Sequence, residues 1–156
     1  MTNSRGMSLE ASVRTGLTTG YSAIFAGGII AAVTGPLNLT KGSWLAAYLV
    51  LIAGLAQLLL VYQGRILRVS PLPARSMWMK FSFWAAGNVA VIAGSLASQP
   101  VIVDLGSLAL VSALIIALVN TRGAPNVVHA WLLRACYVAV LLSIPVGMIL
   151  AHGRAN

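Results

Sequence analysis

Charge is scarce in this chain, and negative charge is nearly absent. Only 8% of its 156 residues are charged and only two are acidic, whereas an average soluble domain is about one quarter charged. A soluble chain of this length needs charged residues on its surface, but a surface that faces lipid can be apolar. With 59% hydrophobic residues, the composition predicts an integral membrane protein. The net charge of +8 comes from basic residues between apolar runs, so we expect membrane orientation rather than nucleic-acid binding.

Groups that hold metals or redox cofactors are also few. Cys136 is the only cysteine, so the chain cannot form an intramolecular disulfide or supply several thiolates to a cluster. His129 and His152 lie about 34 Å apart along an ideal helix, too far to bind one haem together. We therefore expect no cofactor and no metal.

Catalytic motifs are missing as well. The sequence has no GxSxG, HExxH, CxxC or P-loop pattern. The central thirds of its apolar runs lack Asp, Glu, Lys, Arg and His, which usually mark functional sites inside membranes. Glu10 precedes the first run, so the chain departs from small four-helix proton-coupled multidrug exporters, which depend on an acid deep in their first helix. We expect that the protein is not an enzyme.

Five apolar runs are long enough to span a bilayer, which takes about 20 residues. Merging the third and fourth runs into one helix from Phe83 to Val119 would give a length of about 55 Å, and Pro100 disfavours a helical conformation at the preceding residue. The prediction is an all-α polytopic membrane helix bundle of five transmembrane helices in one transmembrane domain, residues 1–156. The helices are expected over residues 17–37, 44–62, 78–97, 101–119 and 127–151.

The basic residues predict the orientation of these five spans. Eight of the ten fall on the side that holds the N-terminus, and Lys41 and Arg154 fall on the other. Cytoplasmic loops carry the excess of Lys and Arg, so we expect the N-terminus inside, the C-terminus outside, and a multi-pass protein of the bacterial cytoplasmic membrane. The eight are Arg5, Arg14, Arg65, Arg68, Arg75, Lys80, Arg122 and Arg134.

The inner loop at residues 63–80 alternates Arg65, Arg68 and Arg75 with apolar residues and two prolines. A basic segment of this kind is typical of a chain that lies on anionic lipid headgroups. The alternative is a docking surface for a soluble partner.

Small residues recur at every fourth position on several of the expected helices. This spacing lets helix backbones approach closely, and close packing holds helices together in lipid. Because five helices offer a limited number of internal contacts, some of these faces are expected to contact another subunit. The predicted helix-packing residues are Ala23, Gly27 and Ala31; Ala86, Ala90 and Gly94; and Ala139, Ser143 and Gly147.

Three polar residues remain inside the apolar runs. Gln57 and Asn88 lie near the middle of the second and third runs, and Asp104 lies near the outer end of the fourth. Amides at such positions hydrogen-bond to neighbouring helices, or the three side chains line a polar path. For Asp104 we expect an interfacial structural carboxylate rather than a proton-relay acid, because of its shallow depth.

Residues 41–51 (KGSWLAAYLVL) and 84–94 (WAAGNVAVIAG) resemble small multi-span membrane proteins of actinobacterial type. The resemblance covers about two helices and implies no activity.

The sequence therefore favours a non-catalytic membrane subunit. We expect it to pack through its small-residue faces against itself or as an accessory subunit of a larger membrane complex, such as a respiratory one. The alternative is a small transporter or channel with a polar path through Gln57, Asn88 and Asp104.

Overall fold

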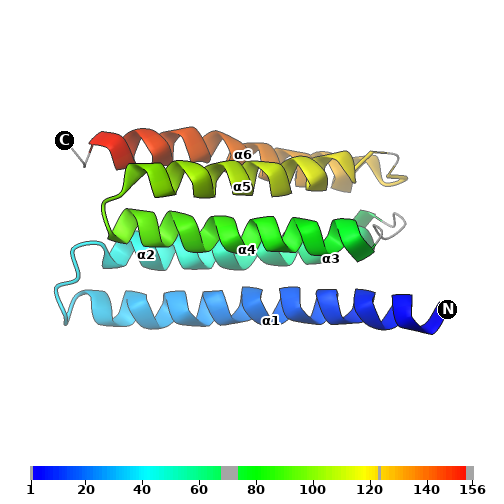
Figure 1. Ribbon diagram of the computed structural model, residues 1–156, viewed down its shortest axis with the longest axis horizontal. Helices are drawn as coiled ribbons and strands as arrows, with labels where there is room; N and C mark the ends of the chain where they lie inside the picture. The colour runs from blue at the N-terminus through cyan, green and yellow to red at the C-terminus, as the bar shows by residue number, and fades with distance from the viewer. Residues whose placement is uncertain (1, 68–73, 123, 154–156) are drawn as a thin grey trace. The chain divides into compact units, whose positions relative to one another are not determined.

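Helices make up nearly all of the described chain, which confirms the all-α prediction. The computed structural model describes residues 2–67, 74–122 and 124–153, and these ranges contain no strand. The three elements α2, η1 and α3 follow one another without a break, and η1 is a π-helix (Figure 1). The helices are α1 (Thr2–Thr34), α2 (Gly42–Tyr48), η1 (Leu49–Ala56), α3 (Gln57–Leu67), α4 (Ala74–Leu96), α5 (Pro100–Val119) and α6 (Val127–Gly153).

In the described residues, four helical segments are long and apolar enough to cross a membrane. They are Glu10–Thr34, Gly42–Leu67, Pro100–Val119 and Val127–Ile149. The helix α4 is not among them, and Lys80 and Asn88 lower its hydropathy. A span over residues 78–97 therefore stays a prediction. Arg68 and Arg154 lie outside the described residues, as do the two prolines of the basic loop.

The contacts within the chain divide it into two compact units, Met1–Val61 and Tyr62–Asn156. In the first unit, α1 packs against α2 and η1. In the second, α4 packs extensively against α5, and α5 packs against α6. Figure 1 shows α4 and α5 as antiparallel neighbours joined by a short turn.

The turn between α4 and α5 closes with a left-handed residue. Ser98 has a φ of 54°, and the Gln99 amide donates to the Gly94 carbonyl over 2.8 Å, as in the Schellman ending of a helix. Pro100 then occupies the first turn of α5, where its missing N–H costs nothing. The helices separate where the sequence analysis divided the third run from the fourth.

The α1–α2 connection uses the same device. Asn38 has a φ of 48°, and the Leu39 amide donates to the Thr34 carbonyl over 3.0 Å. Asparagine tolerates this conformation better than most residues. Both hairpins are thus closed by local backbone bonds, which satisfy carbonyls that the helix ends would otherwise leave unpaired.

Glycines set the close approach of α4 and α5. A Cβ added at Gly87 would lie 2.8 Å from the carbonyl oxygen of Gly106, and one at Gly106 would lie 2.8 Å from the amide nitrogen of Val91. One at Gly94 would lie 2.8 Å from the amide nitrogen of Val103. The two backbones are therefore in contact at three places, which explains why no side chain fits there.

In the first unit, α1 meets the second helical segment in a similar way. A Cβ at Gly27 would lie 2.7 Å from Val50 and 3.0 Å from the carbonyl oxygen of Ala46. One at Gly54, inside the π-helix, would collide with Ile24. Val50 therefore packs against Gly27 of α1, and Ile24 of α1 packs against Gly54. Each helix thus offers a glycine to a side chain of the other.

Candidate functional site: polar groups between the helices

Gln57 connects α3 to α1. Its side chain is 5% exposed, and Nε2 donates to the Gly16 carbonyl over 3.3 Å and to Thr19 Oγ1 over 3.2 Å. Gly20 leaves room for it, because a Cβ there would lie 3.3 Å from Gln57 Cγ. The donor end of this amide is therefore used in helix packing, while its Oε1 is buried without a hydrogen-bond partner in the described part of the chain.

Asn88 uses its amide group within its own helix. Nδ2 donates to the Trp84 carbonyl over 2.8 Å, and the side chain is buried. Its Oδ1 and the indole nitrogen of Trp84 are both buried without a hydrogen-bond partner among the described residues. An acceptor and a donor thus lie one turn apart on the buried face of α4.

Asp104 lies in the second turn of α5 and is half-buried. Its neighbours Val103 and Gly106 contact α4 at Gly94 and Gly87, so Asp104 and Asn88 belong to the same hairpin. Gln57 belongs to the first unit. The structure thus brings two of the three predicted path residues into one hairpin of the second unit.

A buried polar cluster that the sequence analysis missed joins three helices of the second unit. Gln63 Nε2 donates to the Ala117 carbonyl over 2.7 Å, and the Tyr137 hydroxyl donates to Gln63 Oε1 over 3.1 Å. Both side chains are almost fully buried. Gln63 therefore connects the C-terminal part of α3 to α5 and α6, using its donor and its acceptor together.

Arg134 extends this cluster toward the α5–α6 turn. Its Nε donates to Thr121 Oγ1 over 2.8 Å and its Nη2 to the Thr121 carbonyl over 3.1 Å. The guanidinium carbon lies 5.9 Å from the centre of the Trp131 ring, within range of a cation–π interaction. The arginine is thus held beside the C-terminal end of α5, where a positive charge is favourable.

Sequence spacing carried little signal for this cluster. Gln63, Thr121 and Arg134 lie at the ends of apolar runs, where polar residues are ordinary. Tyr137 follows Arg134 by three residues and so lies near it on the same helix face, which is the one hint the sequence offers.

The predicted helix-packing residues occupy several environments. Gly27 and Gly94 are buried at close crossings, and Ala23 and Ala90 are half-buried. The others are exposed: Ala31, Ala86, Ala139, Ser143 and Gly147. Of these, Ala31 lines a groove in the first unit, while a Cβ at Gly147 would meet nothing within 4 Å.

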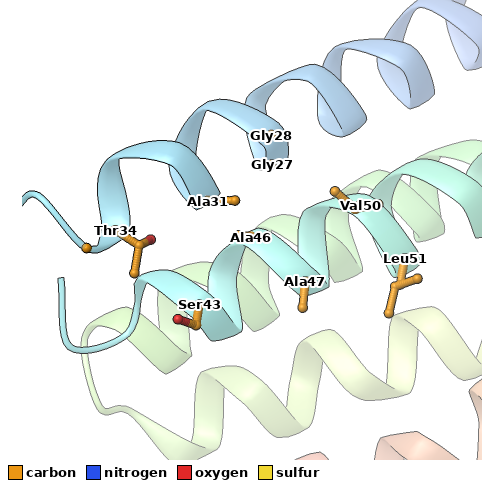
Figure 2. Close-up of a pocket in the computed structure, with 10 residues that line it drawn as sticks. Gly27, Gly28, Ala31, Thr34, Ser43, Ala46, Ala47, Val50 and Leu51 are labelled. Carbon is orange, nitrogen blue, oxygen red and sulfur yellow. The ribbon is translucent and has the colours of Figure 1, made fainter.

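The groove has a volume of about 620 Å³. Figure 2 shows it between the C-terminal part of α1, with Gly27, Gly28 and Ala31, and the α2–η1 segment, with Ala46 and Val50. Its lining is mostly small and apolar, with Thr34 and Ser43 as its polar side chains, so it offers shape but few polar contacts.

Groups of three or more His, Cys, Asp or Glu that could hold a metal do not occur in the described ranges. Over the residues that the structure describes, the fold defines the class of the protein: it is all-helical, with four helices long and apolar enough to cross a membrane. No protein-family model matches the chain, and neither does any curated protein or solved structure.

Proposed function

We propose that the protein is a non-catalytic, five-span subunit of the bacterial cytoplasmic membrane, with its N-terminus in the cytoplasm and its C-terminus outside. It packs against copies of itself or serves as an accessory subunit of a larger membrane complex, such as a respiratory one. Its basic inner loop lies against anionic headgroups.

The observation that carries this proposal is the outward face of α6. Ala139, Ser143 and Gly147 follow one another at every fourth position, and all three are exposed. Such a face allows a second helix to approach closely, and in lipid close packing is a main driving force of helix association. The donor ends of Gln57 and Asn88, which bond to helix backbones, further support a structural role.

Cysteine cross-linking tests this face. In a Cys136→Ala background, Ser143→Cys labelled with a photoactivatable cross-linker is expected to form cross-links, either to a second copy or to a partner subunit in the source membrane. Leu142→Cys is the matched control, because Leu142 is also exposed but lies about 100° around the helix. Equal cross-linking at the two positions, or none at either, would contradict a packed α6 face.

A second candidate is a small transporter with a polar path through Gln57, Asn88 and Asp104. It is favoured by the buried Oε1 of Gln57 and Oδ1 of Asn88, which lack hydrogen-bond partners in the described residues. Buried polar atoms of this kind are costly unless water reaches them. An ion-driven flux in reconstituted vesicles would select this candidate.

A further inference from the structure

The guanidinium of Arg134 is fixed in place but only partly used. Thr121, which receives its two hydrogen bonds, is fully buried, and the Thr121 hydroxyl donates to the Leu118 carbonyl over 2.8 Å. Arg134 is therefore fixed by Thr121, whose own position is fixed by burial and by its bond to Leu118. A guanidinium has five N–H donors, and its bonds to described residues use two of them. The remaining donors, on Nη1 and Nη2, make no hydrogen bond to the residues that the structure describes.

The chain supplies almost no negative charge to balance this group. Its two acidic residues are Glu10 and Asp104. Glu10 belongs to the first unit, and Asp104 lies near the opposite end of α5, roughly 25 Å from Thr121 along the helix. The exposed Arg122 adds a second positive charge next to Thr121. Charge complementarity therefore calls for an anion from outside the chain.

The surroundings favour a lipid as the source of that anion. Trp131 is 65% exposed, and the neighbouring Val128 and Leu132 are exposed as well. An exposed tryptophan at the end of an apolar helix is typical of the headgroup region of a bilayer, and the flanking aliphatic side chains suit acyl chains. An anionic lipid suits both features at once, because its phosphate can meet the guanidinium while its acyl chains meet the apolar side chains.

We propose that Arg134, together with Arg122 and the Trp131 ring, binds the phosphate of an anionic phospholipid at the α5–α6 turn. The arginine supplies paired N–H donors in a fixed plane, a geometry that matches phosphate oxygens. The inference rests on the proposed bilayer placement of α5 and α6. It differs from general attraction to a basic loop, because it assigns one preorganised residue.

The test is lipid binding to the purified full chain in detergent, measured by native mass spectrometry with phosphatidylglycerol and, separately, phosphatidylcholine. The wild type is expected to retain phosphatidylglycerol preferentially. Arg134→Gln should weaken that retention about fivefold, the typical weight of one basic residue at an anionic surface. Arg14→Gln, an exposed arginine of the first unit, is the matched control and should change nothing. Equal losses in both variants, or no lipid preference in the wild type, would overturn the proposal.

Two further experiments separate loss of the site from misfolding and lipid phosphate from free phosphate. Arg122→Gln and Trp131→Leu leave the Arg134–Thr121 bonds in place, and each should weaken phosphatidylglycerol binding without loss of helical circular dichroism. Unchanged binding in both would contradict the site. Inorganic phosphate at the same concentration should not displace the lipid, and displacement would show a site for free phosphate instead. If Ser143→Cys forms no cross-links but the chain still binds phosphatidylglycerol, only the proposed packing function is contradicted.

Discussion

At the residue scale, amide and hydroxyl groups carry most of the specific contacts between helices. Gln57 and Gln63 each bond to the backbone of a neighbouring helix. In lipid such bonds contribute modestly, because the separated helices also find partners. These residues therefore set which helices meet and at what level, while close packing provides most of the stability.

The bond from Tyr137 to Gln63 gives a direct test of this cluster. Tyr137→Phe removes the hydroxyl and leaves Gln63 Oε1 without that donor, so we expect a loss of about 1 kcal/mol in the free energy of unfolding. Tyr62→Phe is the control, because it removes the same group from a half-buried tyrosine that takes no part in the bond between Tyr137 and Gln63. The measurement is reversible unfolding in mixed micelles, and equal effects of the two changes would speak against the cluster.

Asp104 separates the two candidate functions. If the carboxylate is structural, Asp104→Asn should leave assembly of the protein in its membrane intact, since the amide keeps the shape and much of the hydrogen bonding. If it couples transport, the same change should abolish an ion-driven flux in reconstituted vesicles, because the site no longer exchanges a proton. We expect assembly to persist. A flux that vanishes in this variant would promote the transporter.

Single residues were only partly predictable from the sequence. Gln57 and Asn88 stood out because amides are rare in the middle of apolar runs. Gln63, Thr121 and Arg134 lie at run ends, where tertiary contacts alone distinguish a bridging residue from a solvated one.

At the element scale, helix positions were easier to predict than helix faces. The break at residues 97–99 follows from Pro100 and local turn chemistry. The buried face of α4 overlaps the predicted small-residue stripe only in part: Gly94 and Gly87 contact α5, while Ala86 is exposed. Alanine and glycine are so frequent that several stripes run in parallel, and only the facing helix selects among them. The π-helix η1 left no recognisable pattern in the sequence.

The α4–α5 crossing predicts a sharp difference between neighbouring positions. Gly94→Leu places a side chain where a Cβ would already lie 2.8 Å from the Val103 amide nitrogen, so the helices must separate, at a cost of about 2 kcal/mol or more. Ala93→Leu is the control, because Ala93 is exposed. Helix propensity favours leucine over glycine, so destabilisation by Gly94→Leu alone must come from packing. Detergent-unfolding midpoints provide the readout, and equal midpoints would contradict the crossing.

At the scale of the whole molecule, composition alone predicted a helical membrane protein. The number of spans is harder to predict from composition. The helix α4 carries Lys80 and Asn88 on a buried face and so has lower hydropathy than its neighbours. Burial explains this composition: a helix whose polar residues face other helices needs fewer apolar residues to cross a membrane. We therefore count α4 as the fifth span in the proposal, with the eight-to-two distribution of basic residues in support.

The side of the membrane on which the C-terminus lies, compared with that of the segment near Arg75, tests this account most directly. A compartment-sensitive reporter fused after Asn156 is compared with one inserted near Arg75, in the intact protein expressed in a bacterial membrane. Five spans predict an external signal from the first fusion and a cytoplasmic signal from the second. If both reporters lie on the same side of the membrane, the five-span account is wrong.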